Sequence, residues 1–436
     1  MSGHGEIQKL KKVCCIIPAG YIQEKLYAAN FVNNQAQVES ISLSRSSPAY
    51  TTSKNGSIQG VSTSTPQINY DISVKGSVQP DPAILLEEQA KNSIRNDANG
   101  TNGLYCANGT LTPTANPQGT NDQAYIVKSG ATNNYLSNAT GAQINIGQRI
   151  QFSFYCRRIS TRYIHLTIIN TQPQGPADAT FDMELSKPVA LTTAVQSVEM
   201  HRLPNGWFRC VLTTENWAGP GQIIFQMNGT NTLATPTFTP INSEFIVWGL
   251  QAENSDTVTN YIRNTTQGGV TRQPGSMFVG PFAAANPVNA YSGILYIEFK
   301  GVGQTRDGNH DIILGSTSNP NGYYRMRWQS SGGMIFQLNI GGINSIYRTI
   351  ASFDQTKYNK IACNWAENYF EIWINGEKQG TTDTTGAVPS FKNAFSQLQI
   401  GASKAPYGYY REISIYDTGN LANVYDVSAI MENLTK

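Results

Sequence analysis

Charge is scarce in this sequence. Only 14% of its 436 residues are Asp, Glu, Lys or Arg, and the formal net charge is +2. Apart from a small cluster at Lys9, Lys11 and Lys12, the basic residues are scattered along the chain. A phosphate backbone would therefore meet no concentrated positive surface, and we expect no nucleic-acid partner.

Long apolar runs are also missing. No run approaches the roughly 18 residues of a membrane-spanning helix, so we expect no membrane segment. The run VCCII before Pro18 is shorter than the core of a signal peptide, which has about 7 to 15 apolar residues. The six cysteines include no CxxC pair, and the four histidines are not clustered, so zinc-ligand spacing is absent. We expect a reduced protein assembled in the cytoplasm, with no metal and no cofactor.

Catalytic motifs are lacking as well. Glycoside cleavage needs two carboxylates close together, but the acidic residues in strand-like runs, Glu298, Glu371 and Glu412, each stand alone. No G-x-S-x-G nucleophile motif occurs. We therefore expect no enzymatic activity.

One loop is superficially similar to a calcium site. The sequence TRDGNHD places Asp307, Asn309 and Asp311 at alternating positions, as at the start of a calcium loop. The downstream Gly and Glu that such a loop requires are absent, and Asp-Gly is a common turn pair. We therefore expect an ordinary turn here.

Turn-forming and β-forming residues are abundant. The chain contains 39 Gly, 20 Pro and 22 Tyr, a composition typical of short strands joined by turns. Apolar alternation predicts strands at QFSFYC, YIHLTII, FDMEL, WFRCVL and QIIFQM, and later at GILYIEFK and MIFQLNI. The continuous apolar run FIVWGL and the segments KIACNW and YFEIWI, which flank the turn AEN, are also expected to be strands. Asn375-Gly376 predicts a type I′ hairpin, and a short helix is expected at about 421–433. The fold class is therefore all-β.

Composition also divides the chain. Residues 1–38 are the helix-capable part, and residues 39–99 are polar enough to predict an extended stalk. Two β-sandwiches are expected at 100–272 and 291–436, joined by a Pro- and Ala-rich linker at 273–290.

The stretch from Phe245 to Arg272 connects these parts. An apolar strand, Phe245–Leu250, closes the first sandwich, the chain then folds back over it, and Gly268-Gly269 is expected to act as a hinge. The sequences VWGLQAEN, TNYIRNTT and VTR, together with LPNGWFRCVLTTE upstream, resemble a pattern in bacteriophage tail- and head-fibre proteins. In those proteins a carbohydrate-binding-module-like jelly roll precedes a concanavalin-A-like, or laminin-G-like, jelly roll. The segment 360–382 resembles the hairpin of the second module.

The resemblance implies a virion protein, assembled in the host cytoplasm, that forms a homotrimer. It implies a head fibre on the capsid whose sandwiches bind host or environmental glycans. The alternative is a tail fibre or tailspike that binds a receptor or degrades a glycan. The N-terminus is then expected to attach to other virion proteins, of the capsid or the tail. The candidate anchor residues are Lys9, Lys11, Lys12, Ile16, Ile17 and Phe31.

Aromatic residues are the candidates for sugar contact, because flat rings offer a large contact area at low entropic cost. These candidates lie in predicted turns or on the strand face opposite the apolar set. They are Tyr323, Trp373, Tyr407 and Tyr409. The competing interpretation is that these rings pack within the sandwich or at subunit contacts.

Overall fold

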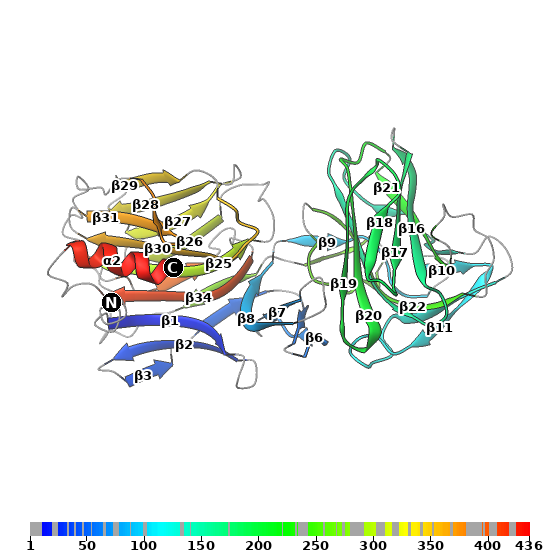
Figure 1. Cartoon of the computed structure of the whole chain (residues 1–436), viewed down its shortest axis with the longest axis horizontal. Helices are drawn as coiled ribbons and strands as arrows, with labels where there is room; N and C mark the ends of the chain where they lie inside the picture. Colours follow the sequence, from blue (N-terminus) through cyan, green and yellow to red (C-terminus); the bar gives the residue numbers. More distant parts are fainter. Residues whose placement is uncertain are drawn as a thin grey trace.

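The computed structural model confirms an all-β fold arranged as two lobes, and the residues that it describes include one short α-helix (Figure 1). It describes residues 11–19, 25–32, 35–38, 41–45, 48–53, 55–63, 67–72, 78–87, 89–98, 103–130, 135–139, 141–172, 175–219, 221–231, 233, 243–255, 258–266, 268–272, 275–279, 292–301, 310–315, 322–329, 333–340, 343–350, 353–366, 369–380, 395, 397–400, 408–417 and 424–436. Within that part of the chain no helix is long and apolar enough to cross a membrane.

The first sandwich is the lobe on the right of Figure 1 and consists of two antiparallel sheets. One sheet has the order β10-β13-β21-β16-β17-β18, with β14 beside β21, and the other has the order β11-β12-β22-β15-β20-β19. The bounds are β10 Leu104–Ala107, β11 Gly109–Thr114, β12 Ala124–Ser129, β13 Tyr135–Asn138, β14 Ala142–Gln143, β15 Ile150–Arg158, β16 Tyr163–Gln172, β17 Gly175–Asp182, β18 Lys187–Ala190, β19 Val195–Arg202, β20 Trp207–Thr214, β21 Gln222–Thr230 and β22 Glu244–Asn254, with a 3₁₀ turn at Pro204–Gly206.

Alternating apolar residues build the core of this sandwich. Ile164, Leu166 and Ile168 of β16 are all fully buried, as the alternation predicts. They share the core with Phe152, whose ring lies 5.1 Å from that of Phe225 between ring centres. The odd-numbered residues of β16 therefore lie on the outer face of their sheet.

The second sandwich is the lobe on the left of Figure 1. One sheet has the order β3-β2-β1-β34-β25-β30-β31-β32, with β8 and then β7 continuing from β34, and the other has the order β29-β28-β27-β26-β33-β24-β4. The bounds are β1 Lys11–Ala19, β2 Lys25–Val32, β3 Gln35–Val38, β4 Ile41–Ser44, β7 Ile68–Ile72, β8 Val78–Leu86, β24 Ser276–Val279, β25 Gly293–Gly301, β26 His310–Gly315, β27 Tyr323–Trp328, β28 Met334–Ile340, β29 Ile343–Ile350, β30 Asn359–Ala366, β31 Tyr369–Ile374, β32 Glu377–Lys378, β33 Gln397–Ile400 and β34 Gly408–Asp417.

The described N-terminal residues are strands, which corrects the helix-capable interpretation of residues 1–38. β1 pairs antiparallel with β34, placing Cys15 opposite Ser414, and β2 and β3 follow outward from β1. Helix propensity is only a weak preference, and an isolated short helix is barely stable in water. Pairing with β34 gives the backbone of β1 hydrogen-bond partners, so the strand conformation is favoured. The N-terminal strands therefore belong to the sheet that also holds β34.

Described strands of the expected stalk region also enter the second sandwich. β4 pairs with β24, and β8 pairs with both β34 and β7. Ile84 and Leu86 of β8 are buried in the same core as Leu295 and Ile415. This sandwich is thus built from chain segments on both sides of the first one.

Two crossing segments between the lobes form a short ladder of their own. β9 (Ala90–Asn92) pairs with β23 (Val270–Arg272), and the Asn92 side chain donates to the carbonyls of Leu250 (3.1 Å) and Ile262 (2.8 Å). Gly268 and Gly269 both have positive φ, at 91° and 89°. The glycines form a turn beside a hydrogen-bonded ladder, and the hinge expected there stays a prediction.

The most specific local prediction concerned the turn after β31. Asn375 and Gly376 both have positive φ, 51° and 82°, as a type I′ hairpin requires. The C-terminal helix is α2 (Val424–Thr435), close to the expected 421–433. It packs on the outer face of the second sandwich, where Val427, Ile430 and Met431 contact apolar residues of β25 and β30.

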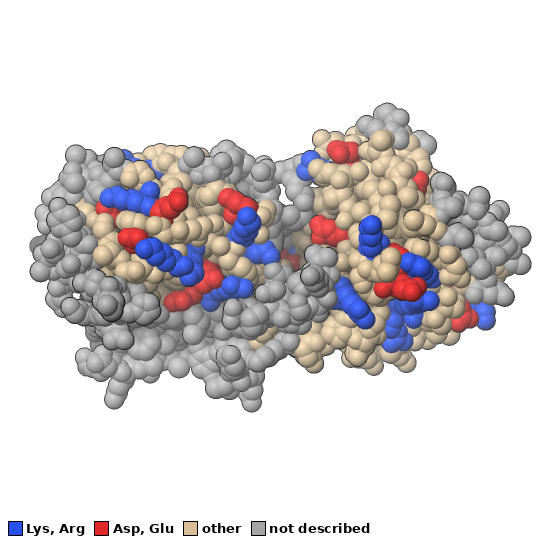
Figure 2. All heavy atoms as spheres, in the orientation of Figure 1, with Lys and Arg blue, Asp and Glu red and all other residues tan. Residues whose placement is uncertain are grey.

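The face of the molecule in Figure 2 carries Lys and Arg side chains interspersed with Asp and Glu. The described residues include ion pairs such as Arg411 with Glu298 at 3.3 Å and Arg162 with Asp182 at 2.7 Å. On the described part of this face the two signs are mixed, and neither forms a continuous patch.

Candidate functional site: a pocket between the two sandwiches

A pocket of about 180 Å³ lies where the two sandwiches meet. Its walls come from the hairpin of β5 (Ala49–Thr52) and β6 (Ile58–Val61), from β7, from the first sandwich and from β34. The lining residues are Thr52, Ile58, Asn69, Tyr70, Tyr155, His201, Leu203, Arg209, Val258, Asn260 and Tyr409. In liquid water each molecule takes up about 30 Å³, so the volume of the pocket corresponds to about six water molecules. A pocket of this size suits one small ring rather than a polymer.

A cluster of aromatic rings supports one wall. The Tyr155 ring lies 4.9 Å from Trp248 and the Trp248 ring lies 4.6 Å from Tyr261, between ring centres. Tyr50 packs on Tyr261 at 5.2 Å. Gly249 has a φ of 63°, and a Cβ there would lie only 3.0 Å from the Tyr155 ring, so this bulge in β22 needs glycine. The rings give the pocket a rigid apolar base.

Hydrogen-bonding groups line the pocket beside these rings. The Arg209 guanidinium lies 5.6 Å from the Tyr155 ring centre and donates through Nη2 to the Thr259 carbonyl. Its Nε is buried without a hydrogen-bond partner. His201 Nε2 lies 3.0 Å from Glu199 Oε2, and this hydrogen bond lowers the pKa of Glu199 against the opposing effect of burial. The pocket thus combines an aromatic surface with a cation and an imidazole.

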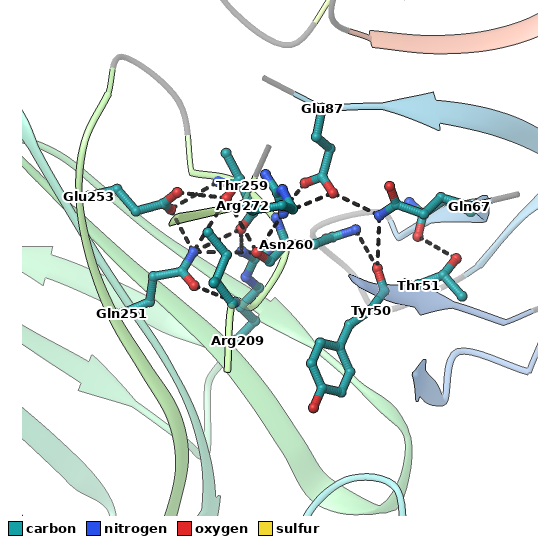
Figure 3. A network of polar contacts seen from close by, with 12 residues as sticks. Tyr50, Thr51, Gln67, Glu87, Arg209, Gln251, Glu253, Thr259, Asn260 and Arg272 are labelled. Carbon is teal, nitrogen blue, oxygen red and sulfur yellow. Dashed lines mark hydrogen bonds and ion pairs between the residues drawn. The ribbon is translucent and has the colours of Figure 1, made fainter. Parts of the chain in front are cut away.

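A buried polar network holds these walls together (Figure 3). Arg272 Nη1 lies 3.0 Å from Glu87 Oε2, and both side chains are almost completely buried. Glu87 also accepts from Gln67 Nε2 at 2.7 Å and from the Asn260 backbone N–H at 2.6 Å. Asn260 Nδ2 in turn donates to the Tyr50 carbonyl at 2.8 Å. One network therefore joins the hairpin of β5 and β6, the two segments that cross between the lobes, and the first sandwich.

A second carboxylate extends the network behind the pocket. Glu253 accepts from Thr259 Oγ1 at 2.6 Å and from Gln251 Nε2 at 2.6 Å, as Figure 3 shows. Burial raises the pKa of Glu253, and these hydrogen bonds oppose that shift. The 258–260 segment that lines the pocket is thereby fixed to β22.

Residues 285–419 match the Concanavalin A-like lectin/glucanases superfamily. We refer to that matched segment as the concanavalin A-like domain, after the family that it resembles. No protein with curated annotation matches the sequence. The concanavalin A-like domain contributes β34, and with it Tyr409, to the pocket.

Similar solved structures include a sialidase CBM40, a pair of laminin domains and a whole sialidase. The CBM40 of Ruminococcus gnavus IT-sialidase, bound to alpha2,3 sialyllactose, is 13% identical, covering 29% of this chain and 76% of that chain with a TM-score of 0.24. Domains LG4-5 of the mouse laminin alpha1 chain are 12% identical, with 63% and 84% coverage and a TM-score of 0.24. Trypanosoma rangeli sialidase is 9% identical, with 94% and 81% coverage and a TM-score of 0.28. TM-scores this low carry no argument about function.

Of the four aromatic residues predicted to contact sugar, one lines the pocket. Tyr409 is half-buried in β34, and Lys300 Nζ lies 5.4 Å from its ring centre. Tyr407 lies outside the described residues. The proposed sugar contact of these residues stays a prediction.

The other two aromatic candidates belong to the concanavalin A-like domain and have protein neighbours. Tyr323 begins β27, and the Arg325 guanidinium lies 5.0 Å from its ring centre. Trp373 on β31 packs against the cluster under α2 and donates from Nε1 to Glu371 at 3.0 Å. Neither of the two lines the pocket.

The anchor candidates lie at the far edge of the second sandwich. Lys11, Lys12, Ile16 and Ile17 belong to β1, and Phe31 belongs to β2. Lys9 lies outside the described residues. The predicted anchoring role stays a prediction.

Asp311 of the TRDGNHD loop has a structural partner. Its carboxylate accepts from Arg327 at 2.7 Å and lies 3.6 Å from Arg325. Asp307 and Asn309 lie outside the described residues. The pair of arginines accounts for this buried carboxylate on β26 without a metal ion.

Sequence patterns did not single out His201, Arg209 or Asn260 as site residues. Each is an isolated polar residue, and His201 and Arg209 become neighbours only because β19 pairs with β20 in that register. Asn260 lies in the TNYIRNTT segment. The resemblance of that segment to phage fibre sequences was the only signal that could have pointed to Asn260.

Proposed function

We propose that this protein is a non-enzymatic appendage of a bacteriophage particle, a head fibre, that binds glycans through the pocket between its sandwiches. The observation that carries the proposal is the lining of that pocket. It sets the Tyr155 and Tyr409 rings beside Arg209, His201 and Asn260, a combination suited to the faces and hydroxyls of a sugar. The similarity of residues 285–419 to concanavalin A-like lectins and glucanases supports the glycan-binding part of the proposal. The placement on a phage particle rests on the sequence resemblance to phage fibres alone.

The proposal excludes glycan cleavage. Among the described residues that line the pocket none is Asp or Glu, and cleavage needs a pair of carboxylates. Purified protein incubated with host polysaccharide should generate no new reducing ends over many hours. Sustained release of reducing ends would instead favour the tailspike alternative.

Binding can be tested at the pocket itself. His201→Ala and Tyr409→Ala should each weaken binding on an array of bacterial surface glycans about tenfold, the loss expected for about 1.4 kcal/mol. Tyr347→Ala is the matched control, because Tyr347 is an exposed tyrosine of the second sandwich away from the pocket lining. Unchanged binding in both pocket variants would overturn the assignment.

Position on the particle needs a separate experiment. Antibody labelling of intact particles, viewed by electron microscopy, should mark the capsid and not the tail. Attachment is proposed to use the N-terminal lysines, so charge reversal of Lys9, Lys11 and Lys12 to Glu should leave folded protein that no longer joins particles. Normal incorporation of that variant would place the anchor elsewhere.

A further inference from the structure

One arginine in the pocket has no ion-pair partner among the described residues. Arg209 lines the pocket from β20, and Figure 3 shows it beside Thr259 and Asn260. It donates a hydrogen bond from Nη2 to the Thr259 carbonyl, and its Nε is buried without a partner. Nη1 forms no hydrogen bond with the described residues. The guanidinium is therefore partly shielded from water and still lacks an anion.

The carboxylates near the pocket do not supply that anion. None of the described residues that line the pocket is acidic, and the carboxylates around it have hydrogen-bonding partners of their own. These contacts are Glu87 with Arg272 at 3.0 Å, Asp122 with Arg263 at 2.7 Å, Glu199 with His201 at 3.0 Å, and Glu253 with Thr259 and Gln251 at 2.6 Å each. A carboxylate brought by a ligand could therefore pair with Arg209 without displacing any of these contacts.

A carboxylate is the ligand group that best matches a guanidinium. Its two oxygens accept from two N–H groups, and such charge-assisted hydrogen bonds are about twice as strong as those to a neutral hydroxyl. Burial of the guanidinium reduces screening by water, which strengthens the attraction further. On the side of the second sandwich, Lys300 Nζ lies 5.4 Å from the ring centre of Tyr409 and adds a second positive charge near the pocket.

We propose that the pocket takes one sugar ring that carries a carboxylate, of the hexuronic acid type. The carboxylate pairs with Arg209, and the ring lies against Tyr155 and Tyr409. His201 and Asn260 are then left for the hydroxyls. This inference rests on the proposed function, in which the pocket binds glycans, and it adds the chemical class of the sugar that the pocket prefers.

Four methyl glycosides test the preference, those of glucuronic acid, galacturonic acid, glucose and galactose. Each acid differs from its neutral counterpart only at C6, which is a carboxylate in one and a hydroxymethyl group in the other. In NMR titrations of the full-length protein at pH 7, at least one acid should bind about tenfold or more tightly than its counterpart. The preference should shrink as salt is added, because ions screen the attraction.

Substitutions at Arg209 show whether this residue causes the preference. Arg209→Met keeps the apolar stem and removes the charge, so it should abolish the preference for the acid. Arg209→Lys keeps the charge and should retain part of the preference, which provides a second test if the methionine variant does not fold. Arg263→Met is the matched control and should leave the preference unchanged, because Arg263 is an exposed arginine, paired with Asp122, that does not line the pocket.

The outcomes separate this inference from the proposed function. Equal binding of each acid and its counterpart, or a preference that survives Arg209→Met, overturns the inference, whereas glycan binding that depends on Tyr409 would still support the pocket. Failure of all four glycosides to bind also overturns it. Glycan-array binding that survives both His201→Ala and Tyr409→Ala overturns the pocket assignment and the inference together.

Discussion

At the junction of the sandwiches one ion pair is almost completely removed from water. The side chains of Arg272 and Glu87 are 1% and 5% exposed, and further polar groups surround them. A buried pair of this kind adds little net stability over an apolar pair of the same shape, but removing one member leaves an uncompensated charge. We expect its main effect to be on the specificity with which the two lobes are arranged.

Removal of one partner should therefore be costly. Arg272→Met is expected to lower the free energy of unfolding by about 3 to 5 kcal/mol, because Glu87 then stays buried without its cation. Urea denaturation followed by tryptophan fluorescence measures this. Lys357→Met is the control, since its pair with Asp354 is largely exposed and should be worth less than about 1 kcal/mol. Equal effects of the two changes would contradict the role of the junction pair.

His165 provides a pH prediction. Burial lowers its pKa from 6.5 to about 4. Between pH 6.5 and about pH 4, His165 is therefore protonated in the unfolded chain but neutral in the folded chain. The free energy of unfolding falls as the pH drops through this window. By pH 4.5 the loss from this residue should be about 2.5 kcal/mol.

The variant His165→Gln isolates that contribution. Glutamine can hydrogen-bond to Thr167 and Thr180 but does not titrate, so its stability should depend less on pH. Chemical denaturation of both proteins at pH 7.0 and 4.5 gives the difference between their losses, which should be about 2.5 kcal/mol. Identical losses would show that His165 accepts its proton at an ordinary pKa in the fold.

Among the elements, β15 and β20 bring two cysteines together. Cys156 Sγ and Cys210 Sγ lie 3.7 Å apart in the core, and both residues are completely buried. Burial raises the pKa of Cys210 well above its usual value, which disfavours the reactive thiolate. Strand pairing therefore protects both thiols.

Iodoacetamide labelling at pH 8 checks this protection. Peptide mass spectrometry should find Cys156 and Cys210 unmodified in the native protein and modified after unfolding in urea. Cys106 serves as the internal comparison, because it is only half-buried, although burial raises its pKa to about 11. Labelling of Cys210 under native conditions would mean that β15 and β20 separate readily.

Helix α2 depends on the sheet beneath it. Met431 is fully buried in the cluster with Ile294 and Tyr296. The buried carboxylate of Glu371 accepts a hydrogen bond from Ser428 Oγ of the helix at 2.6 Å. It also pairs with Lys378 of β32. The helix thus gains stability from packing rather than from its own length.

Truncation of the packed side chain should therefore destabilise the second sandwich. Met431→Ala is expected to cost about 2 to 4 kcal/mol in thermal or urea unfolding, through lost burial and the cavity left behind. Glu432→Ala on the exposed side of the helix should change stability by less than about 0.5 kcal/mol. A small effect of Met431→Ala would show that α2 is not needed for the stability of this sheet.

For the whole molecule, the homotrimer stays a prediction. Light scattering at micromolar concentration should give three times the mass of the 47.7 kDa chain. A monomeric or dimeric mass would contradict it. Among the described strands, β3 and β4 each end a sheet. They are the backbone surfaces to probe first, because edge strands invite pairing between chains.

The sequence was informative where local chemistry decides the structure. Asn375-Gly376 predicted its turn because few residue pairs tolerate two positive φ angles. Alternation predicted which residues of β15 and β16 enter the core, but not that Ser153, Tyr155 and His165 on the opposite faces are buried as well. It was misleading at β2, where a helical pattern yields to pairing with β1. The pocket could not be predicted, because Arg209 and Tyr409 are 200 positions apart and only the folding of both lobes brings them together.

The pairing of β1 with β34 also constrains how the protein is made. A ribosome adds about 5 to 20 residues per second, so roughly 20 to 80 seconds separate the emergence of Lys11 from that of its partner Asp417. The first sandwich has all its strands long before then and can fold during synthesis. Until then, the backbone groups of β1 that pair with β34 have no partner on the chain. The nascent chain, rather than the finished protein, is therefore the species most exposed to aggregation and to chaperones.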